Sequence, residues 1–196
     1  MYSNPSEMSH FVEEQTFEKI DYTLERLERG DYEQCTFVNC NFANSDLSQI
    51  RFIDCTFQDC NLSTTKLGGT GFQDVRFYNC KMLGLHFDEC SDFLFQVFFD
   101  GCQLNHSSFF KNKLVKTIFS ECKLQEVDFT DCNLTSADFK HSDIVGAAFT
   151  NCTLAKADFR AALNLSIDPE KNRMKGALFS QQNVVGLLNK YQIVIQ

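Results

Sequence analysis

The chain has 196 residues, among them 21 Phe, 10 Cys and no Trp, and its formal net charge is −8. Nucleic acids and anionic membranes bind clusters of Lys and Arg, so this charge argues against either as a direct partner and favours a protein with a basic surface. Residues 1–15 lack the basic and apolar regions of a secretory signal, and no stretch approaches the ~18 apolar residues of a membrane span. We therefore expect a soluble, cytoplasmic protein that begins with a short N-terminal segment.

Residues 16–165 carry a large apolar residue at every fifth position, a period that neither a helix nor a strand produces. The residue two positions before each of these centres is mostly small, and the other three positions are mostly polar. Glu25 occupies one of the small-residue positions, so we expect a distorted first turn. The period slips by two residues near 91–93, which predicts a bulge or small corner loop, and it resumes at Leu94 and Phe99.

The pattern resembles the pentapeptide-repeat consensus, Ala-Asp/Asn-Leu-X-X, most clearly in the segments CTFVNCNFANSDLSQI and TSADFKHSDIVGAAF. The resemblance implies an all-β solenoid, a right-handed quadrilateral β-helix of about seven turns with one repeat per side. Side chains twenty residues apart then stack in columns. One such column is all phenylalanine and is the predicted structural core: Phe17, Phe37, Phe57, Phe77, Phe99, Phe119, Phe139 and Phe159. A second column runs through Tyr32, Phe52, Phe72, Leu94, Leu114, Leu134 and Leu154.

The ten cysteines invite a metal or redox interpretation, but all of them fall on the inward small-residue position, where a thiol packs as a compact hydrophobe. Zinc needs ligands that converge tetrahedrally, whereas Cys40, Cys60 and Cys80 are expected in a parallel stack. Stacked pairs such as Cys35 and Cys55 lie within the Cα separation that a disulfide tolerates. A reducing compartment and parallel Cβ directions nevertheless disfavour that bond.

The four histidines, His10, His86, His106 and His141, fall on different repeat positions and meet no Ser or Asp partner on one face. General acid–base chemistry needs a desolvated cleft, which the flat walls of a solenoid do not offer. We therefore predict that the protein is not an enzyme and that it has no catalytic residues, no metal site and no cofactor.

Past residue 165 the five-residue period fades, and residues 166–196 are predicted to form a C-terminal capping module. Ser180 is a candidate N-cap for a short α-helix over residues 181–190, whose apolar residues have helical spacing. Residues 191–195 then alternate as a short strand. The apolar side of the helix is expected to cover the end of the solenoid, which otherwise exposes core and unpaired strand edges.

Two segments, VRFYNCKMLGLHF and the tail SIDPEKNRMKGALFSQQNVVGLLNKYQIVIQ, are similar to the bacterial pentapeptide-repeat subgroup that contains the albicidin-resistance and microcin B17-resistance proteins. The plasmid quinolone-resistance proteins are more distant. In that subgroup the tail resembles a dimerisation module, and an isologous contact between two tails is physically reasonable. The resemblance implies a homodimer with these interface residues: Leu178, Phe179, Val184, Val185, Leu187, Leu188, Tyr191, Ile193 and Ile195.

The same resemblance implies an acidic rod that mimics DNA, binds the basic DNA saddle of DNA gyrase or topoisomerase IV, and protects the enzyme from a poison. Candidate partner-binding residues are expected at or near the corners of the square: Asp54, Asp59, Asp74, Glu121 and Asp131. The alternative is a generic interaction scaffold with a non-topoisomerase partner. Residues 31–165 hold 17 Asp and Glu against 11 Lys and Arg, and these charges can also serve only to solvate the solenoid.

Overall fold

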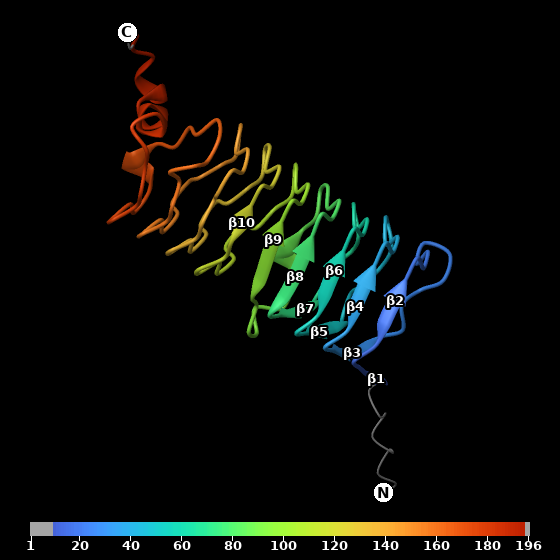
Figure 1. The fold of residues 1–196 in the computed structure, drawn as a ribbon. Coiled ribbons are helices and arrows are strands. Elements are labelled where there is room, and N and C mark those ends of the chain that lie inside the picture. The colour runs from blue at the N-terminus through green and yellow to red at the C-terminus, as the bar shows by residue number, and fades with distance from the viewer. Residues whose placement is uncertain (1–9, 195–196) are drawn as a thin grey trace, which may run out of the picture.

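The computed structural model describes residues 10–194, which wind into a parallel β-solenoid (Figure 1). Successive turns lie on one another, and the C-terminal segment lies at the opposite end of the coil from β1 (His10–Glu13). Four columns of parallel backbone pairing run along the coil, and they define four walls that we call A, B, C and D. This arrangement confirms the quadrilateral β-helix that the resemblance to the pentapeptide-repeat consensus implies.

Walls A and B contain all the strands among the described residues. Wall A has a four-stranded sheet of β1, β3 (Gly30–Glu33), β5 (Arg51–Ile53) and β7 (Gly71–Gln73). Wall B has a six-stranded sheet of β2 (Thr16–Glu18), β4 (Thr36–Val38), β6 (Thr56–Gln58), β8 (Val75–Tyr78), β9 (Val97–Asp100) and β10 (Phe119–Ser120).

Isolated parallel bridges build the rest of the walls. They extend wall A from Lys113 to Arg173 and wall B from Ile118 to Leu178. Wall C consists of bridges between Asp21 and Leu163, and wall D of bridges from Asp46 to Lys66 and from His86 to Ala148. One 3-10 helix, η1 (Phe87–Glu89), lies within the coil, and another, η2 (Pro169–Lys171), lies near its end.

The backbone register joins residues twenty positions apart, as Phe37 pairs with Phe57. Across the interruption the step is 22 residues, so Phe77 pairs with Phe99. The stacking already includes β1, which pairs with β3, and its last bridge reaches Leu178, so it extends beyond residues 16–165 at both ends. The first turn is distorted as predicted, because Glu25 is exposed instead of pointing inward.

Wall B carries an unbroken column of stacked phenyl rings. Eight successive ring pairs, from Phe17 to Phe179, have centroids 4.7 to 5.5 Å apart and interplanar angles of 9° to 19°. The column contains every residue of the predicted phenylalanine column and adds Phe179. Offset stacks contribute about 0.5 to 1.5 kcal/mol per pair beyond apolar burial, so the column stabilises the register between turns. Rings of wall D meet these rings edge to face, as Phe129 meets Phe119 at 80°.

The small inward side chains link one turn to the previous one. The hydroxyl of Thr65 donates to the Phe42 carbonyl at 2.7 Å, and the hydroxyl of Ser142 donates to the Phe119 carbonyl at 2.9 Å. The thiol of Cys132 makes the equivalent bond to the Phe109 carbonyl at 2.8 Å. All ten cysteines are free and buried. The inward small-residue position of the repeat therefore favours a small side chain that both fills space and donates a hydrogen bond.

The predicted inward position of Leu94 is wrong. Residues 91–96 form a loop on wall A in which Leu94 is 64% exposed and has a left-handed backbone (φ 54°), and Phe93 is 67% exposed. Phe95 packs against the core instead. The N–H of Phe95 donates to the Asp92 carbonyl at 3.4 Å and closes a turn. That turn takes up the extra residues, so the chain re-enters the core one position later than the sequence pattern indicated.

The predicted α-helix over residues 181–190 consists of two 3-10 helices, η3 (Asn183–Leu187) and η4 (Asn189–Tyr191). Gly186 packs against Leu165 so closely that a Cβ atom on it would lie 2.2 Å from the Leu165 carbonyl oxygen. Glycine and β-branched valine also have low helix propensity, which weakens an α-helix in so short a segment. The predicted N-cap is wrong as well, because Gln182 is the residue that precedes η3 and it makes no side-chain cap hydrogen bond. The Ser180 hydroxyl nevertheless accepts a hydrogen bond from the Asn183 N–H at 3.1 Å.

The predicted strand over residues 191–195 is absent from its described part. Tyr191 ends η4, Gln192 has a left-handed backbone (φ 51°), and residues 193–194 belong to no strand. Ile195 lies outside the described residues. The left-handed residue turns the chain after η4, so the alternation in the sequence does not produce an extended run.

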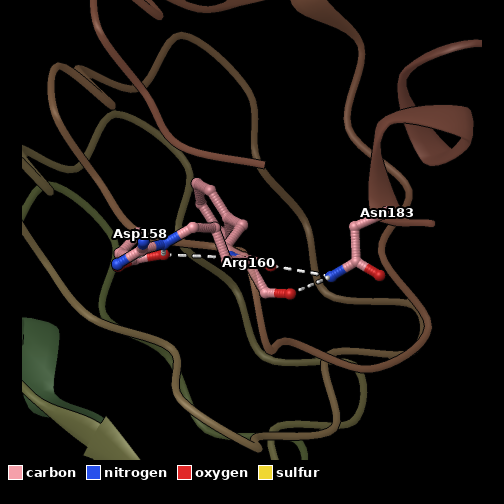
Figure 2. A network of polar contacts seen from close by, with 4 residues as sticks. Asp158, Arg160 and Asn183 are labelled. Atoms are coloured by element: carbon pink, nitrogen blue, oxygen red, sulfur yellow. Dashed lines mark hydrogen bonds and ion pairs between the residues drawn. The ribbon is translucent and has the colours of Figure 1, made fainter. Parts of the chain in front are cut away.

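Asn183 fastens the C-terminal segment to the last full turn of the coil (Figure 2). Its side-chain amide donates to the carbonyls of Phe159 and Ala162, both at 2.7 Å. Next to it, the Arg160 guanidinium donates to the Asp158 carboxylate at 2.7 Å, and this bond lowers the pKa of that carboxyl. The Asn183 side-chain amide thus donates to carbonyls that the backbone of a further turn would otherwise pair with. Leu187 adds an apolar contact, because it packs against the core.

We predict that Phe77→Ala lowers the free energy of unfolding by about 3 to 5 kcal/mol, because it leaves a cavity between two turns. Phe77 is fully buried, and its ring stacks on Phe57 and Phe99 at 5.1 and 5.3 Å. Urea unfolding followed by circular dichroism measures the loss. Phe93→Ala removes an exposed ring and serves as the control, expected within about 0.5 kcal/mol of the unaltered protein. Equal stability of the two variants contradicts a stabilising role for the column.

Candidate functional site

The corners of the coil present the acidic candidates outward. Asp54, Asp59, Asp74, Glu121 and Asp131 all have a positive φ, between 53° and 60°. A left-handed residue turns the chain from one wall to the next, and Asp tolerates this conformation better than most residues do. All five candidates therefore occupy corner positions.

Four of the five acidic candidates flank wall B. Asp54 and Asp74 come just before β6 and β8, on the edge that wall B shares with wall A. Asp59 and Glu121 follow β6 and β10, on the edge shared with wall C. The structure thus brings these residues together as two rows along one wall. Asp131 lies apart from them, at the corner between walls D and A.

The two acidic rows differ in how far neighbouring cations neutralise them. Arg76 lies between Asp54 and Asp74, with its nitrogens 3.5 and 2.9 Å from the two carboxylates. Asp59 accepts a hydrogen bond only from the Gln58 amide, at 3.1 Å, and neither Asp59 nor Glu121 forms an ion pair with a described residue. The row on the wall C edge therefore keeps its full negative charge.

Sequence reasoning missed the apolar side chains on the outside of walls A and B. Tyr78 and Ile118 are about 40% exposed on wall B, and Phe98 lies between them over the Arg76 guanidinium, which is 5.5 Å from the ring centroid. These residues line a shallow groove of about 510 Å³. The sequence does indicate two of these exposed apolar side chains. Phe98 and Ile118 stand directly before inward phenylalanines, at a position where most repeats carry a polar residue.

The tail places most of the predicted dimer-interface residues on the surface. Six of them are exposed: Leu178, Val184, Val185, Leu188, Tyr191 and Ile193. Val185, Leu188 and Ile193 line a hollow of about 490 Å³ together with Asn189 and Gln192. Phe179 and Leu187 instead pack against the core of their own chain. Ile195 lies outside the described residues.

No catalytic constellation is formed by the residues that the structure describes. His86 and His106 lie 3.4 and 3.2 Å from Asp88 and Glu126, and no described Ser, Thr or Cys side chain bonds to a histidine. Within residues 10–194, no three His, Cys, Asp or Glu side chains are arranged to hold a metal ion. That part of the chain also contains no helix with the length and apolar character needed to cross a membrane.

The family model described as pentapeptide repeat region matches residues 31–96 and 86–159. No curated protein matches the chain in sequence. The fold is similar to that of QnrB1, a plasmid-mediated fluoroquinolone resistance protein, whose trypsin-treated form is 16% identical over 96% of this chain and 98% of that chain, with a TM-score of 0.56. Full-length QnrB1 is 20% identical over 94% and 100% of the two chains, with a TM-score of 0.48.

HetL, a pentapeptide repeat protein involved in heterocyst differentiation regulation in the cyanobacterium Nostoc, is 13% identical over 86% of this chain and 85% of its own, with a TM-score of 0.48. At 16% identity the trypsin-treated QnrB1 structure, with its TM-score of 0.56, establishes a shared fold and nothing finer. The two family matches, however, cover residues 31–159 without a gap, which is well over half of the chain. Together with the four-walled coil, these matches show that the chain belongs to the pentapeptide-repeat family.

Proposed function

We propose that this protein is a non-enzymatic acidic rod that binds the basic DNA-binding surface of DNA gyrase or topoisomerase IV and protects that enzyme from a poison. The observation that carries the proposal is the pair of carboxylate rows along wall B. The fold likeness to QnrB1, a fluoroquinolone resistance protein, supports it. The proposal requires the protein to act in the cytoplasm, where such an enzyme meets the chromosome.

The spacing of the carboxylates fits electrostatic recognition of a basic surface. Turns repeat at about 4.8 Å, so Asp54 and Asp74 stand one turn apart, and Asp59 and Glu121 stand three turns, about 14 Å, apart. Duplex DNA carries one charge per ~1.7 Å, so the rows reproduce DNA only sparsely. Binding of this kind is steered by charge and weakens with added salt.

We predict that the double variant Asp59→Lys with Glu121→Lys abolishes protection of gyrase without unfolding the rod. Lysine suits these corners, because Lys19 occupies the same corner column with φ 57°. The measurement is gyrase supercoiling with a fluoroquinolone present, while the purified protein is titrated and the salt concentration is varied.

The matched control for this experiment is Glu126→Lys. Glu126 is also a left-handed corner residue, with φ 54°, but it lies on the corner between walls C and D. Protection should survive this change. Absence of protection by the unaltered protein at micromolar concentration, together with absence of salt-dependent gyrase binding, would rule the proposal out.

A scaffold with a non-topoisomerase partner is the second candidate function. The ion pairs of Arg76 with Asp54 and Asp74 favour it. Arg76 neutralises part of the row formed by Asp54 and Asp74, which leaves few unpaired carboxylates for DNA mimicry. A pull-down with the purified protein separates the two functions. Recovery of another protein, with gyrase absent, supports the scaffold.

The proposal includes a homodimer formed through residues 166–196. Six predicted interface side chains are exposed and apolar there, and a stable isologous contact needs such a patch. We predict a sedimenting mass of twice the 22.5 kDa chain, and a single-chain mass for Val185→Glu with Leu188→Glu. Leu24→Glu, at an exposed leucine near the other end, should leave the dimer intact. A monomeric unaltered protein at tens of micromolar contradicts the prediction.

A further inference from the structure

The loop at residues 91–96 interrupts the backbone pairing of wall A with the following turn. On its other side the N–H groups of Ser91 and Gln96 still donate to the Thr70 and Phe72 carbonyls, both at 2.9 Å. β7 is the last strand of its sheet, and the next bridge on this wall joins Lys113 to Asn133. On walls C and D, Gln103 and Ser108 donate their N–H groups to carbonyls of the previous turn, at 2.9 and 2.8 Å. The equivalent N–H on wall A, that of Lys113, has no backbone partner among the described residues. An unpaired backbone edge therefore faces the loop.

A hollow of about 880 Å³ lies between this loop and the following turn. Its lining combines two kinds of side chain. Leu94, Phe95 and Phe98 provide an apolar side, and Lys111, Lys113 and Lys116 provide a basic side. Asp92 is the one carboxylate among the described residues that line it. We call this feature the lysine groove.

The three lysines of the groove are available for a ligand. All three are exposed, and no carboxylate of a described residue lies within ion-pair distance of them. Lys111 and Lys116 stand at the two corners of the wall, where both have a left-handed backbone, and Lys113 lies between them. The three lysines therefore concentrate positive charge on one wall of a chain whose net charge is −8.

The apolar side of the groove is presented at a cost. Leu94 adopts a left-handed backbone, which is sterically unfavourable for a residue that carries a Cβ atom, and its side chain remains mostly in water. Phe93 beside it is equally exposed. Two adjacent apolar side chains on the surface, next to a hollow, indicate a surface that binds another molecule.

We infer that the lysine groove binds an extended acidic peptide segment of a partner protein, with carboxylates at alternate positions and apolar side chains between them. Alternate residues of an extended chain lie on one side about 6.6 Å apart, and Lys111 and Lys113 are likewise two residues apart on the outside of the wall, with the buried Asn112 between them. The peptide's carboxylates would face the lysines, its apolar side chains would face Leu94 and Phe98, and its backbone would pair with the open edge at Lys113.

A peptide suits this surface better than a nucleic acid does. The basic row is confined to one turn, while the acidic corner rows of wall B and the net charge of −8 repel a long polyanion. The inference does not depend on the topoisomerase proposal, which concerns a basic partner and a different set of residues.

The test is fluorescence anisotropy of a fluorescein-labelled peptide, Gly-Glu-Phe-Glu-Leu-Glu-Gly, titrated with the full chain. We expect saturable binding that weakens with salt, and at least about a tenfold rise in Kd for Lys113→Glu with Lys116→Glu. Lys156→Glu is the matched control, since Lys156 is an exposed left-handed residue in the corner column of Lys116, two turns away. Leu94→Ser tests the apolar side separately and should also weaken binding.

Circular dichroism confirms that each variant is folded before its Kd is interpreted. No saturable binding of the peptide up to about 1 mM overturns the inference, because such an affinity is negligible. A loss of binding free energy in Lys156→Glu that is half of that in the groove variant or more overturns it too. Binding would then follow net charge alone, because the control variant changes the charge by −2 and the groove variant by −4. Tighter binding of a single-stranded oligonucleotide of equal charge assigns the groove to nucleic acid and contradicts the peptide.

Discussion

Stacking of like side chains at twenty-residue intervals holds each turn of this protein on its neighbours. The rings of wall B repeat at 4.7 to 5.5 Å, close to the ~4.8 Å spacing of paired strands, so one geometry satisfies both aromatic stacking and backbone pairing. A slip of one residue would turn the rings toward water. It would also take hydroxyls and thiols such as those of Thr65 and Cys132 away from the carbonyls that they bond. Two independent interactions therefore select the same register.

Because the interior is filled, recognition is left to the corners and the outer faces of the walls. Most corners have a left-handed residue. That conformation favours Asp, Asn and Gly, so part of the acidity of the surface follows from the backbone alone. Lys111 and Lys116 occupy the same kind of position, however. The fold thus tolerates either sign of charge at a corner. The fold therefore does not dictate the charge of either the acidic rows along wall B or the lysine groove on wall A. Each of these two surfaces is a candidate binding site for a partner.

The period of five, together with the resemblance to the pentapeptide-repeat consensus, was sufficient to predict the four-walled coil, the phenylalanine column and the inward thiols, because a strict repeat carries the same constraint in every turn. Where the repeat breaks, prediction became less accurate. Leu94 was assigned to the core, yet Phe95 fills that place, since spacing alone does not tell which residue of an insertion returns inward. The helix over residues 181–190 failed for a tertiary reason, namely the close contact of Gly186 with Leu165. The lysine groove could not be predicted, because it depends on a gap between turns.

Inward side chains fill a closed interior in every turn of the coil. The solvent accessibility of the ten thiols measures this closure directly. All ten are buried, and burial raises the pKa of Cys55 to about 12 and that of Cys152 to about 11, so neither thiolate forms readily near neutral pH. Reaction with Ellman's reagent measures their accessibility. We expect almost no reaction in the folded protein within minutes and reaction of all ten thiols in denaturant. Rapid reaction of several thiols in the folded protein would contradict the closed coil.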